Sequence, residues 1–169
     1  MITDNMETGI KILGIVAVAG LLLSCAPSNN RLTPTVEAET ERQVRHAFNG
    51  LVDASKSLDT LRYLSYVDAE HFVGLNANGT VWRSRDELSG SIQQAFDSIA
   101  RVTSLDFTTV EISVIDDQTA VLVNEYEQAL LLKTGETLRV AGGGAQVWSR
   151  ATGDWKLVSI SASNAPLAR

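Results

Sequence analysis

The sequence predicts an α+β domain in which helices come first and long strands follow. In the first half of the chain, apolar residues recur every three or four positions, which is the spacing of one face of a helix. In the second half, apolar and polar residues alternate over long segments separated by short turns, which is typical of strands in a half-buried sheet. The predicted order of elements is α-α-β-β-α-β-β-β-β.

Three segments carry helical signals. The first spans residues 36–58, and Thr35 is its predicted N-cap. The second spans residues 59–67. The third begins after Ser84, which has Glu87 three positions later and apolar residues on one face beyond it. This spacing is that of a capping box, in which two side chains accept hydrogen bonds from the free backbone N–H groups at the helix start.

The strands are predicted from alternation and from the turns between them. A short hairpin is expected at residues 71–75 and 80–82, with Asn-Gly at the end of its turn. Longer strands are predicted at residues 108–115, 119–133, 137–149 and 155–161, separated by short segments rich in Asp, Gly or Thr.

The first thirty residues follow different rules from the rest of the chain. An apolar run of about twelve residues, Ile12 to Leu23, follows Lys11. Crossing the hydrocarbon core takes about 20 apolar residues, so this run is too short for a membrane-spanning helix and is typical of an export signal. The sequence Leu22-Leu23-Ser24-Cys25 resembles the bacterial lipobox. That resemblance implies that diacylglycerol is attached to the thiol of Cys25 and that the chain is cut before it.

These features divide the chain into four parts. Residues 1–24 are the predicted signal peptide, 25–34 a flexible tether rich in Pro, Ser, Asn and Thr, 35–163 the globular domain and 164–169 a C-terminal tail. We therefore expect a protein that is anchored in the bacterial cell envelope through lipid on Cys25. The residue after the cysteine is Ala26 rather than aspartate, which implies the periplasmic face of the outer membrane.

Charge and histidine content argue against other classes of protein. The formal net charge is −6 and Lys and Arg do not cluster, so we expect no nucleic acid partner. The two histidines, His46 and His71, are far apart in the sequence, and Cys25 is the single cysteine. No metal site is therefore predicted, and we expect no cofactor.

Two motifs accompany this order of elements. Gly79-x-x-Trp82 precedes the third helix, and Gln146-Val-Trp148 is followed by Gly153-Asp-Trp-Lys-Leu-Val158. Their order and spacing over residues 36–163 resemble the SnoaL-like branch of the nuclear transport factor 2-like superfamily. The resemblance implies a cone, in which a strongly curved antiparallel sheet wraps around three N-terminal helices and leaves a pocket between them. It also implies a homodimer that forms through the convex face of the sheet.

Such a pocket is the usual form of a small-molecule site, and the strand at residues 119–133 offers it one of two faces. One face carries Leu122, Asn124, Tyr126 and Gln128, and the other carries Val121, Val123, Glu125 and Glu127. The first face would form an aromatic site with hydrogen-bonding groups. The second would bury two carboxylates, which would raise the pKa of at least one and create an acid–base pair. We favour solvated glutamates, because carboxylates are rarely buried without a cationic partner.

His71 is a third candidate for a general base, although we favour a partly exposed histidine at a strand edge. Many SnoaL-like relatives carry His-x-His on the last strand, whereas this chain has Ser159 and Ser161. Hydroxyls can bind a ligand but cannot act as bases at neutral pH without an activating partner. The candidate ligand-binding residues are Tyr63, Trp82, Phe96, Asn124, Tyr126, Trp148 and Ser161.

The sequence therefore predicts a lipid-anchored domain that binds a small hydrophobic or mixed-polarity ligand, or a protein partner, without catalysis. The alternative is an enzyme of the isomerase, cyclase or hydrolase kind that uses Glu125, Glu127 or His71 as its general base. Strand register separates the two readings, because inward glutamates favour the enzyme, whereas inward Asn124 and Tyr126 favour binding.

Overall fold

The computed structural model describes residues 32–165. The predicted signal peptide, Cys25 and most of the predicted tether lie outside the described residues, as does the end of the predicted C-terminal tail. Within residues 32–165, no helix is both long enough and apolar enough to cross a membrane.

In this part of the chain, three helices and six strands follow one another in the predicted order. The helices are α1 (Pro34–Lys56), α2 (Thr60–Ser65) and α3 (Arg85–Ser98), and the strands are β1 (Val73–Leu75), β2 (Val81–Trp82), β3 (Ile99–Val114), β4 (Thr119–Leu132), β5 (Thr137–Ser149) and β6 (Lys156–Ala165). β3 begins well before the predicted residue 108, because register shifts next to Arg101, Ser104 and Thr109 interrupt the alternation of its side chains. β6 continues past the predicted domain end at residue 163.

Caps set the starts of α1 and α3. Thr33, and not the predicted Thr35, is the N-cap of α1, and its hydroxyl accepts a hydrogen bond of 3.3 Å from a backbone N–H of the first turn. Pro34 occupies the first helical position, where the missing N–H has no partner to lose. The predicted cap at Ser84 is confirmed, since its hydroxyl accepts a hydrogen bond from the N–H of Glu87.

The six strands form one sheet in the order β2-β1-β6-β5-β4-β3. All neighbours are antiparallel except β1 and β6, which run parallel with Gly74 opposite Ile160. The sheet is thus mixed rather than wholly antiparallel as expected. A parallel pair needs a long connection between its strands, and here β2, α3 and β3–β5 together provide it.

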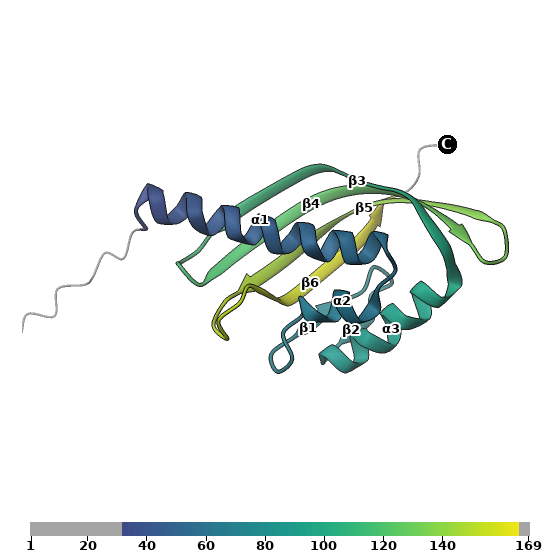
Figure 1. Cartoon of the computed structure of the whole chain (residues 1–169), viewed down its shortest axis with the longest axis horizontal. Helices are drawn as coiled ribbons and strands as arrows, with labels where there is room; N and C mark the ends of the chain where they lie inside the picture. Colours follow the sequence, from purple (N-terminus) through teal and green to yellow (C-terminus); the bar gives the residue numbers. More distant parts are fainter. Residues whose placement is uncertain (1–31, 166–169) are drawn as a thin grey trace, which may run out of the picture. The chain divides into compact units, whose positions relative to one another are not determined.

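The helices lie against one face of this curved sheet. Figure 1 shows α1 running across β3–β6, with α2 and α3 beside the short β1 and β2 strands. α1 buries Phe48 and Leu51 in the core. Leu122, Trp148 and Leu157, from three neighbouring strands, are fully buried in the same core. Each such side chain contributes about 1.5–3 kcal/mol when it leaves water, so this contact between α1 and the sheet supplies much of the stability.

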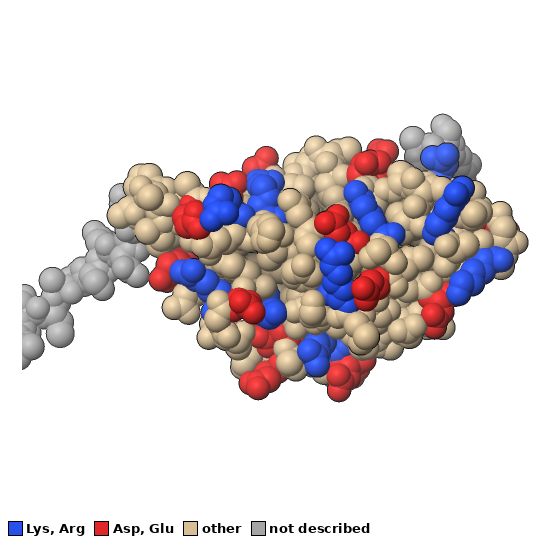
Figure 2. All heavy atoms as spheres, in the orientation of Figure 1, with Lys and Arg blue, Asp and Glu red and all other residues tan. Residues whose placement is uncertain are grey.

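Surface charges of both signs are mixed. Figure 2 shows Lys and Arg interspersed with Asp and Glu over the face that it draws. Along α1, Arg42 pairs with Glu39, and Arg45 pairs with Glu41 at 2.9 Å. Exposed pairs of this kind contribute about 0–1 kcal/mol each, so the fold depends on its core rather than on its surface ion pairs.

A buried carboxylate fixes the connection between α2 and β1. The backbone N–H of Asp68 donates to the carbonyl of Leu157, which ties the connection to β6. Oδ1 of Asp68 accepts backbone hydrogen bonds from Glu70 (2.9 Å) and His71 (2.7 Å) and lies 3.2 Å from Nδ1 of the His71 ring. Burial raises the pKa of the Asp68 carboxyl, but these hydrogen bonds outweigh it and hold the pKa below its ordinary value.

We predict that Asp68→Asn lowers the free energy of unfolding by about 1–3 kcal/mol at neutral pH, because the carboxamide oxygen can still accept from Glu70 and His71 but lacks the negative charge that strengthens these hydrogen bonds. The folded-state pKa is depressed, so this contribution is present above the unfolded value of about 3.9 and is lost as the pH falls through the folded value. Urea unfolding at about pH 7 and about pH 3 measures both effects, with the exposed Asp106→Asn as control. Equal stability of variant and wild type at neutral pH would contradict this role.

Candidate ligand-binding cavity

A cavity of about 310 Å³ lies between the three helices and the sheet. This volume is at the lower end of the range of about 300–1,000 Å³ that is usual for small-molecule sites. The polar part of the lining comes mainly from β4 and β5. The apolar part includes Phe48, Leu51, Ile92, Phe96, Phe107 and Ile160.

Aromatic pairs hold the walls of the cavity in place. Phe48 of α1 and Phe107 of β3 meet edge to face, with ring centroids 5.0 Å apart. Tyr63 of α2 and Phe96 of α3 meet in the same way at 6.1 Å. Such pairs contribute about 0.5–1.5 kcal/mol each beyond their burial. The walls are therefore linked to one another and the cavity is preformed.

The register of β4 decides which of its two faces meets the cavity. Asn124 and Tyr126 line the cavity, together with Gln128. Glu125 and Glu127 are exposed on the opposite, convex face of the sheet. The carboxylate of Glu125 accepts a hydrogen bond of 2.9 Å from a hydroxyl of β3. The two glutamates are thus solvated, which is the alternative that the sequence analysis favours.

Asn124 and Tyr63 bring free hydrogen-bonding groups to the cavity. Asn124 is only 7% exposed and Tyr63 only 8%. Within residues 32–165, neither the carboxamide of Asn124 nor the hydroxyl of Tyr63 has a hydrogen-bond partner in the protein. Every side-chain N or O atom of this part of the chain that is fully buried from solvent does have a partner. The free groups of these two residues therefore open onto the cavity. A ligand in the cavity can therefore form hydrogen bonds with these groups.

Two glutamines of the lining, Gln128 and Gln146, are absent from the candidates chosen by sequence. Oε1 of Gln146 accepts a hydrogen bond of 2.9 Å from Nε1 of Trp148, which leaves its NH₂ group for the cavity. The alternation of side chains could have indicated both residues. Gln146 shares a face of β5 with Trp148, and Gln128 shares a face of β4 with Tyr126.

Two glycines of β5 make room for these side chains. A Cβ on Gly144 would meet Oδ1 of Asn124 at 3.5 Å, an ordinary contact, so a larger side chain there would project into the cavity. A Cβ on Gly142 would overlap the backbone carbonyl oxygen of Ser163 on β6 and lie 2.9 Å from the hydroxyl of Tyr126. The Tyr126 ring therefore occupies the space above Gly142, and its hydroxyl donates to Asn164 of β6 at 3.1 Å.

The ionisable groups of the lining are tyrosines. Burial raises the pKa of Tyr63 to about 12, and it also raises the pKa of Tyr126. Both phenols stay protonated at neutral pH. No Asp, Glu, His, Lys or Arg stands among the described residues that line the cavity. The cavity therefore offers hydrogen bonds but no proton acceptor of the kind that general-base catalysis needs.

Four of the seven candidate ligand-binding residues lie in the lining: Tyr63, Phe96, Asn124 and Tyr126. The other three lie elsewhere. The indole N–H of Trp82 donates to the hydroxyl of Ser91 on α3, and Trp148 is fully buried in the core. Ser161 is exposed on the convex face, because its neighbour Ile160 points into the cavity and side chains alternate along β6.

The family model of the SnoaL-like domain matches residues 44–168. The chain belongs to this family. The match includes every strand and every cavity residue, and it leaves out only the start of α1 among the described elements. A comparison with curated protein sequences gave no match.

Solved structures share the fold of this SnoaL-like domain. A candidate scytalone dehydratase from Novosphingobium aromaticivorans superposes with a TM-score of 0.73 at 8% identity, over 79% of this chain and 89% of that chain. A candidate dehydratase of the nuclear transport factor 2-like family from Streptomyces avermitilis gives 0.68 at 20% identity, over 78% and 99%. A ketosteroid isomerase-like protein from Erwinia carotovora atroseptica gives 0.65 at 16% identity, over 74% and 96%. At these identities the likeness establishes the nuclear transport factor 2-like fold and nothing beyond it.

None of the three candidate bases of this SnoaL-like domain lies in its cavity. Glu125 and Glu127 are on the convex face, and the His71 side chain is 68% exposed beside Asp68. Within residues 32–165, no group of three or more His, Cys, Asp or Glu side chains is placed to hold a metal ion.

Proposed function

We propose that this SnoaL-like domain binds a small, uncharged and largely apolar molecule in its cavity and does not transform it. The observation that carries the proposal is the lining, which combines aromatic walls with free but neutral polar groups, above all the carboxamide of Asn124. A charged ligand would lose its hydration there without gaining a counter-charge. A molecule with a carbonyl or hydroxyl group would pair with Asn124, Tyr63 or Gln146.

The alternative function is an isomerase, cyclase or hydrolase. A solved structure with this fold is named as a ketosteroid isomerase-like protein, which supports an isomerase as the alternative for this chain. Such reactions need a proton acceptor within hydrogen-bond reach of the substrate. The lining supports binding better, because its ionisable groups are phenols whose pKa values lie far above neutral pH.

We predict that the neutral fluorescent compound N-phenyl-1-naphthylamine binds in the cavity and that Gly144→Val weakens this binding about tenfold, since the new side chain fills part of the space. Fluorescence titration of the purified protein measures the dissociation constant. Ala145→Val is the matched control, because it adds apolar volume to the same strand on the exposed convex face. Equal weakening by both substitutions would contradict the location.

The same titration tests the role of Asn124. In the wild type, 1-naphthol should displace the fluorescent compound more effectively than naphthalene, because its hydroxyl pairs with the free carboxamide. Asn124→Leu should keep affinity for naphthalene and lose the preference for 1-naphthol. Turnover of a bound compound by the wild type would overturn the proposal that the domain is not catalytic, but it would not contradict the location of the binding site.

We further propose that lipid on Cys25 anchors the domain in the bacterial cell envelope, at the periplasmic face of the outer membrane. The support is a pattern of sequence: the apolar run at residues 12–23, the lipobox-like sequence that ends at Cys25, Ala26 after it, and the polar tether that follows. The cavity would then be held close to a membrane, where apolar molecules are concentrated.

We predict that the full chain, expressed in a bacterium, incorporates an alkyne-labelled fatty acid and sediments with membranes. Cys25→Ser should abolish the label, because it removes the only thiol of the chain. Ser28→Ala, in the tether, is the control. An unlabelled wild-type chain, or a labelled Cys25→Ser chain, would contradict the proposal that lipid on Cys25 anchors the protein.

An uncharged band on the convex face supports a homodimer. Strand pairing places Val81, Leu75, Ser161, Ala145 and Val123 in one row and Val73, Ser159, Val147 and Val121 in the next. Val73, Val81 and Val123 are 51%, 50% and 45% exposed. Apolar area of this kind on a soluble domain commonly marks an interface, and we propose that two copies pair through it.

We predict that the purified protein sediments as a dimer and that Val123→Lys shifts it to monomer, because a charge would be buried without a partner in the interface. Sedimentation velocity measures the change. Leu61→Lys, on α2, makes the same substitution at a residue that is 83% exposed and outside the band. A monomeric wild type would contradict this proposal and leave the cavity proposal intact.

A further inference from the structure

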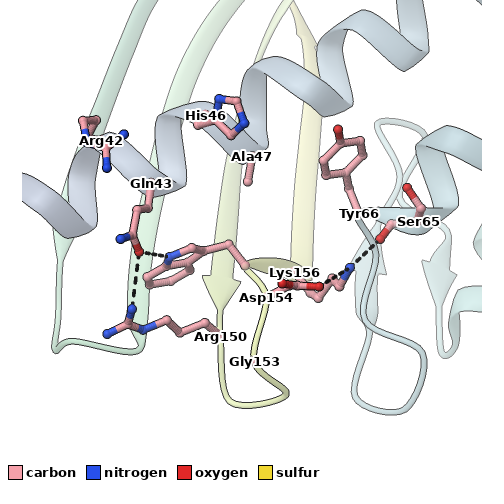
Figure 3. A pocket seen from close by; sticks show the side chains of 11 residues that line it. Arg42, Gln43, His46, Ala47, Ser65, Tyr66, Arg150, Gly153, Asp154 and Lys156 are labelled. Carbon is pink, nitrogen blue, oxygen red and sulfur yellow. Dashed lines mark hydrogen bonds and ion pairs between the residues drawn. The ribbon is translucent and has the colours of Figure 1, made fainter.

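A second concave site lies outside the cavity. A groove of about 490 Å³ opens between α1, the end of α2 and the turn that joins β5 to β6 (Figure 3). It shares no lining residue with the cavity. Its apolar lining consists of Ala47, Tyr66 and Trp155, and its cationic lining consists of Arg42, Arg150 and Lys156.

Hydrogen bonds hold the aromatic and cationic groups of the groove in place. Oε1 of Gln43 accepts from Nε1 of Trp155 at 2.9 Å and from the Arg150 guanidinium at 3.3 Å. That guanidinium also lies over the Trp155 ring, 5.7 Å from its centroid. Nζ of Lys156 donates to the carbonyl of Ser65 at 2.8 Å. Both cations are thus positioned in advance, which lowers the ordering cost of binding.

Among the described residues, the two carboxylates that come within 4.0 Å of these cations lie beyond hydrogen-bond length. Nζ of Lys156 is 3.8 Å from Asp154, and the Arg150 guanidinium is 4.0 Å from Asp117. The cationic side chains are 28% and 33% exposed, whereas the acidic side chains are 88% and 56% exposed. Such pairs are weak. Lys156 and Arg150 therefore keep N–H groups for an anion, in partly desolvated surroundings where charged hydrogen bonds are strong.

In Figure 3, Arg150 points toward Gln43 of α1, whereas Lys156 points toward Ser65 at the end of α2, so the two cations lie apart in the groove. The third cation, Arg42, is already bound by Glu39 and contributes less. We propose that this groove is a second binding site, for an elongated molecule with an anionic group at each end and a flat apolar middle. Each anionic group, a carboxylate or a phosphate, pairs with one of the two cations, and the apolar middle lies against Tyr66, Ala47 and the part of Trp155 that Arg150 leaves uncovered.

Terephthalate, which has a carboxylate at each end of one ring, tests the proposal against benzoate and neutral benzamide. Each is titrated into the purified protein while the indole N–H signals of its three tryptophans are followed by NMR, and Trp155→Phe assigns the relevant signal. We expect terephthalate to bind about tenfold more tightly than benzoate, and benzamide to leave the Trp155 signal in place. Lys156→Gln should weaken terephthalate binding about tenfold, because one charged hydrogen bond is lost.

Asp154→Asn should change the affinity for terephthalate in the opposite direction to Lys156→Gln. It removes the carboxylate beside Lys156, so terephthalate should bind more tightly to this variant than to the wild type. Lys133→Gln, at an exposed lysine after β4, is the control for a general loss of charge, and Gly144→Val should change only the cavity. Equal affinity for the three compounds, no response to Lys156→Gln, or weaker binding to Asp154→Asn would each overturn the proposal.

Discussion

The pairing of β4 with β5 is the constraint on which the rest of the domain depends. It sets Leu122 opposite Gln146 and Asn124 opposite Gly144. Because side chains alternate along a strand, this register puts Leu122 in the core, Asn124 in the cavity and Glu125 in solvent. A shift by one residue would bury Glu125 and expose Leu122, and an uncompensated buried charge costs several kcal/mol. The charge pattern of β4 thus protects the register that makes the cavity.

The cavity exists because large aromatic side chains surround a place where the sheet carries glycine. Aromatic rings from α1, α2, α3 and β3 form the walls, while Gly144 of β5 leaves space beside Asn124. A core built only for stability would fill this space and pair its polar atoms. Here Asn124 keeps a free carboxamide at 7% exposure. A polar group that is left free at the wall of an apolar cavity is what a ligand with a hydrogen-bonding group would use.

α1 separates the two concave sites. Ala47 lines the outer groove, and the next residue, Phe48, lines the cavity. The two sites differ in chemistry, because the cavity lining is uncharged and the groove lining carries three cations and one carboxylate. The two proposed sites would therefore suit different ligands, a neutral apolar molecule inside and an anionic molecule outside. The helix between them is anchored on both sides, by Phe107 from the sheet and by the hydrogen bonds of Gln43 to the turn before β6.

The sequence by itself determined the order of the elements, the cap at Ser84 and the extents of β4 and β5, because helix periods, caps and turns are properties of neighbouring residues. The alternation of side chains along β4 also limited the choice of a cavity-lining face to two sets of residues. Only the tertiary structure decided between these two sets, because the helices that pack on the sheet determine which face of β4 is buried. The bulges that lengthen β3, the parallel pairing of β1 with β6 and the groove between α1 and the turn before β6 join residues far apart in the chain. Such contacts leave no local period, and so no pattern in the sequence could predict them.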